Sequence, residues 1–158
     1  MARGVLIALG IGGGLLVGIA VLAVLLTRRE PPLYPPTTPE GVTQRYLQAL
    51  AQEQWAEAYT YLAPDLQARC TLDAWQSQVA FARYTLEQSA VLLRGVDYRD
   101  EGTVVVRVVF SQPAPPRPFQ LTPQDWTSEH QFRLKRQADG SWKFAVFPWP
   151  LWPEGQCP

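Results

Sequence analysis

The chain opens with a long apolar segment, and its pattern changes sharply afterwards. Residues 5–26 carry no charge and read VLIALGIGGGLLVGIAVLAVLL. A helix needs about 20 apolar residues to cross a hydrocarbon core of roughly 30 Å. A cleaved signal peptide usually has a shorter apolar region of about 7–15 residues, and a buried core helix would show a polar face. The pattern therefore predicts a transmembrane anchor over 1–29, followed by one water-soluble body.

Three glycines of this segment, Gly10, Gly14 and Gly18, lie four residues apart. On a helix they would form one stripe along which another helix can approach closely. One hypothesis is therefore self-association, or binding of a protein partner, through the anchor. The alternative is a membrane helix that tolerates glycine, which is common in such helices. Both interpretations stay open.

A proline-rich linker over 30–37 follows, with four prolines in eight residues. Such a sequence favours extended polyproline II and predicts a semi-rigid spacer of about 3 Å per residue. Thr38 and Pro39 then suit the N-cap and the first position of a helix.

Apolar residues next recur with a helical period in three groups. The groups are Val42, Tyr46, Leu47 and Leu50; Trp55, Ala58, Tyr59 and Leu62; and Leu72, Trp75, Val79 and Ala82. Pro64 is expected to end the second helix, because the residue before proline is disfavoured in the helical region. Thr71 is a second N-cap. The pattern over 38–83 predicts three helices, with one short turn allowed over 65–69.

Alternating and β-branched sequence replaces the helical period after Tyr84. Strands are predicted over 89–99, 103–111, 126–136 and 141–147, with turns at 100–102 and 139–140. Proline excludes residues 113–118 from a central strand. Helices followed by paired strands indicate an α+β domain with an antiparallel sheet of about four strands.

Over 38–147 the chain resembles the nuclear transport factor two-like superfamily, in particular its small membrane-anchored bacterial members. The resemblance is carried by PEGVTQRYLQALAQEQWAEAYTYLAPDLQAR, by TLDAWQSQV and by RLKRQADGSWKF. It implies a cone in which three helices pack on a curved antiparallel sheet and leave a cavity between them. Such folds include isomerases, dehydratases, ligand binders and non-enzymatic modules, so the resemblance does not select a function.

If the cone keeps a cavity, its lining is expected to be apolar with few polar groups. The expected lining residues are Tyr59, Trp75, Trp126, His130, Phe132 and Trp142. A filled core is the alternative for the aromatic residues, and His130 is either a general base or a hydrogen-bonded structural residue. One histidine and two distant cysteines do not form a zinc site, so no catalytic residue, metal or cofactor is predicted.

The end of the chain and the regions beside the anchor carry three further features. The Pro/Trp-rich tail 148–158 is expected to fold back over an apolar surface, with presentation to a partner as the alternative. Cys70 and Cys157 are predicted to pair, which suits an exterior, oxidising compartment. The arginines flanking the anchor, Arg3 on one side and Arg28 and Arg29 on the other, do not decide its orientation.

The net charge of the body argues against nucleic-acid binding. Without Arg3, Arg28, Arg29 and Glu30, the 14 basic and 14 acidic residues become 11 and 13, a net charge of −2. Nucleic-acid binding requires a basic patch that this balance does not provide. The sequence therefore predicts a single-pass plasma-membrane protein of a bacterial cell envelope, with an extracytoplasmic, non-catalytic binding or assembly module. The alternative is a small-molecule sensor or enzyme that uses a cavity near His130.

Overall fold

The computed structural model describes residues 33–100, 102–112, 126–151 and 157. The chain divides into two units, Met1–Leu33 and Tyr34–Pro158, and the fold described below is that of the second. The predicted anchor 5–26, with Gly10, Gly14 and Gly18, lies outside the described residues. Within the part of the chain that is described, no helix is long and apolar enough to cross a membrane.

The body is α+β, as predicted, but its described part holds five helices where the sequence predicted three. They are α2 (Pro39–Ala51), α3 (Trp55–Thr60), α4 (Pro64–Arg69), α5 (Leu72–Val79) and α6 (Ala82–Glu87). Pro64 does not simply end a helix: it is the first residue of α4, where a missing N–H costs nothing. The predicted third helix is split, because Ala82 and Leu86 pack into the core as a separate helix against α2.

The start of α2 follows the predicted cap and also explains how the linker ends. The Thr38 side chain accepts a hydrogen bond from the Gly41 N–H at 3.1 Å. The Tyr34 N–H donates to Gln44 Oε1 at 2.9 Å, and the Arg45 guanidinium donates to the Tyr34 carbonyl at 2.9 Å. Tyr34 and Pro35, within the predicted linker 30–37, therefore lie against α2.

Gly41 makes this contact possible. A Cβ atom at that position would overlap the carbonyl oxygen of Pro35. The absence of a side chain lets the two backbone segments approach closely, which is a common structural use of glycine.

Four antiparallel strands form the sheet in the order β1-β2-β3-β4. Their bounds are β1 (Ala90–Asp100), β2 (Thr103–Gln112), β3 (Trp126–Arg136) and β4 (Trp142–Phe144). The first three strands match the prediction to within one residue at either end. The last is shorter than the predicted 141–147, because the chain turns into the core at Phe147.

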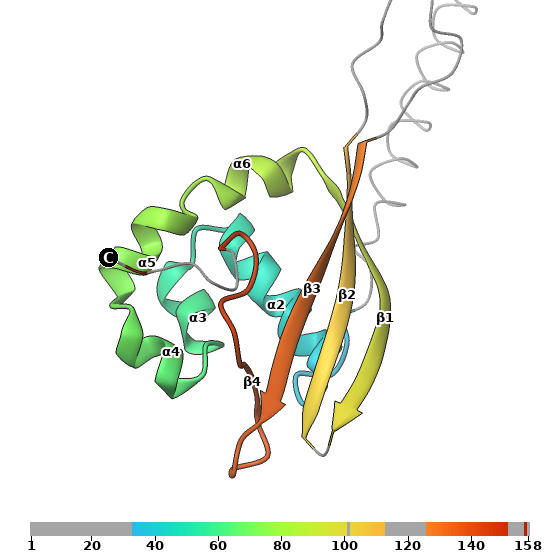
Figure 1. Ribbon diagram of the computed structural model, residues 1–158. Helices are drawn as coiled ribbons and strands as arrows, with labels where there is room; N and C mark the ends of the chain where they lie inside the picture. Colours follow the sequence, from blue (N-terminus) through green and yellow to red (C-terminus); the bar gives the residue numbers. More distant parts are fainter. Residues whose placement is uncertain (1–32, 101, 113–125, 152–156, 158) are drawn as a thin grey trace, which may run out of the picture. The chain divides into compact units, whose positions relative to one another are not determined.

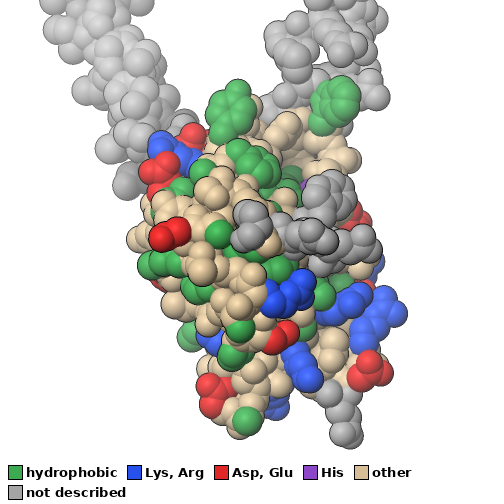
Figure 2. Space-filling view, turned by 60° about the vertical axis from the view of Figure 1, so that its left-hand side comes forward, with side chains coloured by type: hydrophobic (Ala, Val, Ile, Leu, Met, Phe, Trp, Pro, Cys, Tyr) green, Lys and Arg blue, Asp and Glu red, His purple; other side chains and the backbone are tan. Residues whose placement is uncertain are grey.

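The helices cover one face of the sheet, which we call the inner face (Figure 1). Residues of β2 alternate, so that Val104, Val106, Val108 and Phe110 enter the main core. They meet Phe132 and Leu134 of β3 and the helical residues Tyr46, Leu50 and Trp75. Figure 2 shows large hydrophobic side chains on the surface at the upper end of the domain. In Figure 1 this is the end of the domain where α6 lies.

Candidate functional site

The inner face near His130 is occupied by the chain's own tail. The rings of Phe110 and Trp149 lie edge-to-face with centroids 4.6 Å apart. The imidazole of His130 lies 4.9 Å from the Phe110 ring and 5.8 Å from the Trp149 ring. Such aromatic contacts contribute about 0.5–1.5 kcal/mol each beyond the area that they bury. The imidazole is therefore part of a packed aromatic cluster, which we call the Trp149 cluster.

The polar contact of His130 is local. Its Nε2 lies 3.2 Å from the Ser128 Oγ, two residues earlier on the same strand. Burial lowers the pKa of His130 below its ordinary value of about 6.5. The surroundings of the imidazole are those of a partly buried residue packed between aromatic rings.

Two further contacts hold the tail in this place. The buried Tyr46 hydroxyl donates a hydrogen bond to the Trp149 carbonyl at 3.0 Å, and burial raises the Tyr46 pKa well above its ordinary value. Phe147 is buried, with the Arg69 guanidinium 5.5 Å from its ring centroid. Across the described residues 148–151, the tail thus folds back over an apolar surface, as expected.

Cys70 and Cys157 lie at disulfide distance, as predicted, with Cα atoms 5.3 Å apart and a sequence separation of 87. This Cα separation is within the range that a disulfide requires. Cys70 follows α4, and Cys157 lies near Gln78 of α5, whose Nε2 is 3.6 Å from its sulfur. The pair therefore ties the end of the tail to the helical layer.

The six residues predicted to line a cavity do not share one environment. Trp75 and Phe132 are fully buried in the core, whereas Tyr59, His130 and Trp142 are partly exposed. The Tyr59 hydroxyl donates to the carbonyl oxygens of Cys70 and Gln67, at 2.6 and 3.1 Å. For Tyr59, which lies in α3, these hydrogen bonds favour the filled-core alternative over a cavity-lining role.

Trp126 departs most from the prediction, because 67% of its surface is exposed. It lies on the same face of β3 as Phe132, so the alternation was predicted correctly. Among the described residues, however, the buried positions of β3 begin only at Phe132. Sequence periodicity gives the face of a strand but not how far along the strand that face is covered.

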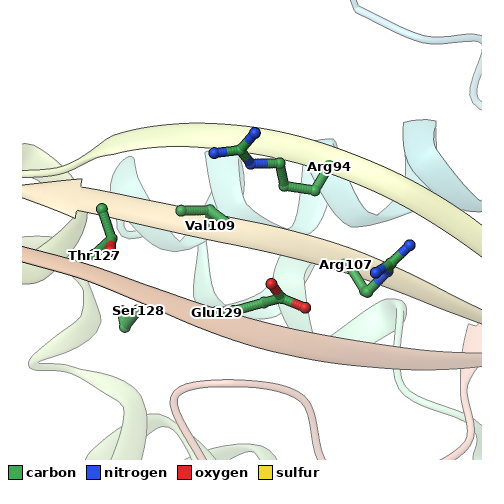
Figure 3. Close-up of a pocket in the computed structure, with 6 residues that line it drawn as sticks. All are labelled: Arg94, Arg107, Val109, Thr127, Ser128 and Glu129. Carbon is green, nitrogen blue, oxygen red and sulfur yellow. The ribbon is translucent and has the colours of Figure 1, made fainter.

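The opposite, outer face of the sheet carries a hollow that the sequence did not indicate. A volume of about 500 Å³ is lined by Arg94, Arg107, Val109, Thr127, Ser128 and Glu129. Figure 3 shows the Glu129 carboxylate directed from β3 toward β2, the strand of Arg107, with Arg94 on the next strand, β1. Strand alternation alone assigns Arg107 to this face, but only the strand pairing brings Arg94 and Glu129 beside it.

Charge on this outer face is mixed. The Arg107 Nε lies 3.2 Å from the Asp97 Oδ2, an ion pair on adjacent strands. That nitrogen is buried and makes no well-directed hydrogen bond, so its contact with Asp97 is chiefly electrostatic. A second hollow of about 450 Å³ on the same face is lined by Arg99, Asp100, Thr103, Val105, Gln131 and Arg133. Both hollows are open and charged, which suits a polar macromolecular surface better than an enclosed small molecule.

A third hollow, of about 490 Å³, lies between α4 and the turn after β3 and is lined by Ala63, Asp65, Lys135, Arg136, Gln137, Ala138 and Ala145. No cluster of three or more His, Cys, Asp and Glu side chains that could hold a metal ion occurs among the described residues.

Comparison with known proteins gives no family. No protein-family model and no curated protein matches the chain. Among solved structures, the chain is similar to a SEC-C motif containing protein from Rhodopseudomonas palustris. The identity is 14% and the TM-score 0.46, over 70% of this chain and 77% of that one.

A second similar structure is a putative calcium/calmodulin dependent protein kinase II association domain from Xanthomonas campestris. The identity is again 14% and the TM-score 0.39, over 73% of this chain and 88% of that one. Both likenesses are weak and carry no argument about fold or function.

Proposed function

We propose that the chain is a membrane-tethered, non-catalytic binding or assembly module of a bacterial cell envelope. The observation that carries the proposal is the Trp149 cluster. The place where the nuclear transport factor two-like resemblance implies a cavity holds the chain's own tail, packed on Phe110 and His130. A domain with a filled interior interacts through its surfaces.

The surfaces of the body support such a role. Phe81, Tyr84, Leu92 and Trp126 are all more than half exposed, at the end of the domain where α6, the start of β1 and the start of β3 lie. Exposed large hydrophobic side chains, such as Phe81 and Tyr84 at the start of α6, often mark interaction sites. The outer face offers the mixed charges of Arg94, Arg107 and Glu129 for specificity.

The tether is the apolar segment 5–26, whose length and lack of charge suit a single membrane-spanning helix. We place the body outside the cytoplasm, on the exterior side of the plasma membrane. This placement is supported by Cys70 and Cys157, because their disulfide would persist in an oxidising environment.

Affinity capture of the full-length chain from native membranes tests the proposal. We expect captured protein, a partner or a second copy, to decrease with Gly14→Leu, which fills the predicted helix–helix stripe. Gly12→Leu is the matched control, because it adds the same side chain off that stripe. Arg94→Glu and Tyr84→Ser test the outer face and the hydrophobic end of the body in the same way.

Native mass spectrometry separates this function from the sensor or enzyme alternative. A binding or assembly module retains no small molecule when released from native membranes. A stoichiometric small ligand whose binding changes with Trp149→Ala would support the alternative. Capture that is unchanged by Gly14→Leu, Arg94→Glu and Tyr84→Ser would refute the assembly role.

A further inference from the structure

The two edges of the sheet are unlike each other. β1 forms one edge, and its pairing with β2 is interrupted by register shifts between Leu93 and Gly95 and between Tyr98 and Asp100. Such irregularities protect an edge strand from pairing with another chain. β3, by contrast, pairs with β2 without interruption over ten residues, from Gln112↔Trp126 to Thr103↔Lys135.

Most of the outward edge of β3 has no partner among the described residues. β4 pairs only with Leu134, Lys135 and Arg136, and the Ala145 N–H then donates to the Arg133 carbonyl at 2.9 Å. Beyond that bond the chain turns away from β3 toward the helices (Figure 1). The described residues of the tail contact the inner face at the Trp149 cluster and do not pair with the edge of β3.

The backbone groups at this edge can be assigned residue by residue. Because the Arg133 carbonyl faces β4, the odd-numbered residues of β3 direct their N–H and C=O groups outward. Thr127, Glu129 and Gln131 therefore present a row of backbone donors and acceptors, and their side chains are exposed. A regular row of this kind is a template for an added strand.

We propose that the added strand is β3 of a second copy of this chain, so that two sheets join into one of eight strands. The inference rests on the proposed assembly function and names its partner. Two identical antiparallel strands pair about a two-fold axis, and the sequence selects where that axis lies. With Ser128 opposite Ser128 of the second copy, Thr127 lies opposite Glu129, and Trp126 lies opposite His130 on the inner face.

Other axes are less favourable. An axis at Glu129 would oppose two carboxylates directly, and like charges at that position destabilise strand pairs. An axis at His130 would require the edge groups of Arg133, whose carbonyl already accepts from Ala145. The Ser128 axis opposes no like charges among the described residues, uses only unoccupied backbone groups and pairs the exposed Trp126 with an imidazole.

Disulfide cross-linking of the full-length chain in mild detergent tests the axis. Ser128→Cys places two sulfurs at a non-hydrogen-bonded pair, where Cα atoms are about 4.5 Å apart and a disulfide can form. We expect a band of twice the monomer mass without reductant. Gln131→Cys is the matched control, since its two copies would lie about 20 Å apart along the strands. A cross-link through His130→Cys, with none through Ser128→Cys, overturns the register.

Charge substitution tests the same pairing without cysteine. Thr127→Glu would oppose Glu129 of the second copy at two symmetric places, and Thr127→Lys would attract it. The dimer dissociation constant, measured by sedimentation in detergent, should rise roughly 2- to 30-fold with the first and fall comparably with the second. Adding Glu129→Lys to Thr127→Glu should restore dimerisation.

Equal dissociation constants for the two Thr127 variants would overturn the proposal. Repeating the cross-linking and sedimentation measurements with Gly14→Leu distinguishes strand-edge pairing from association through the anchor. If edge pairing fails while membrane capture still depends on Gly14, only the second-copy inference is lost and the proposed function stands.

Discussion

The link between Cys70 and Cys157 allows the most quantitative prediction. A disulfide stabilises mainly by restricting the unfolded chain, and the effect grows with the length of the closed loop. For the separation of 87 residues the loop-entropy relation gives about 4.6 kcal/mol at 25 °C as an upper value. Loss of native disulfides commonly costs about 2–5 kcal/mol, so we expect Cys157→Ser to lower the free energy of unfolding by about 2–4 kcal/mol.

Urea denaturation of the full-length chain in detergent, followed by tryptophan fluorescence, measures this loss. With a urea dependence of about 1–2 kcal/mol per molar, the midpoint should fall by roughly 2 M. Reductant should lower the wild-type midpoint to that of Cys157→Ser and leave the variant unchanged. Cys70 is buried as a small apolar group, so the remaining thiol adds no unsatisfied polar atom.

The structure also predicts which residues are destabilised first when the link between Cys70 and Cys157 is lost. Amide exchange should rise at Phe147, Trp149 and Leu151, which follow β4, before it rises at Tyr46 in α2. Tail residues are held by the Tyr46–Trp149 hydrogen bond and by aromatic packing, and a local opening needs only those contacts to break. Identical urea midpoints for protein shown by mass to be oxidised and reduced would refute the reasoning.

Three further variants test separate parts of the body. Gly41→Ala should lower the free energy of unfolding by about 1–3 kcal/mol, because the added methyl group overlaps the Pro35 carbonyl oxygen. Proteolysis should then cleave the chain near Pro35. An unchanged free energy of unfolding would contradict that close approach. Tyr46→Phe should lower the free energy of unfolding in urea by about 1–3 kcal/mol, since the partly buried Trp149 carbonyl loses its donor. His130 has a lowered folded-state pKa, so the unfolded chain binds its proton first and stability should decrease as pH falls below about 6.5. The difference in unfolding free energy between wild type and His130→Asn, followed from pH 8 to 5, should show that decrease, and a flat difference would contradict burial of the imidazole.

Much of the fold followed from local patterns in the sequence. Thr38 and Thr71 cap helices as predicted, because capping depends on residues within one turn. The first three strands appear where alternating and β-branched residues predicted them, since period-two burial is a property of each strand alone. The α+β class follows from the order of these elements.

Helix number and the environment of the aromatic residues depended on packing. α6 is a separate helix because Ala82 and Leu86 pack against α2, and Trp126 is exposed although it shares a strand face with Phe132. Neither outcome is a property of a short window of sequence, because each depends on what lies opposite.

The amino-acid sequence by itself determined the α+β class of the body, the position and faces of its first three strands, and the presence of two cysteines able to pair. The tertiary structure alone decided that Trp149 packs on the inner face beside His130 and that Arg94, Arg107 and Glu129 line one hollow. It also decided that, among the described residues, β4 pairs with only one end of β3. The physical reason is distance along the chain. These contacts join residues tens of positions apart, and strand pairing and core packing bring such residues together only when the whole domain folds.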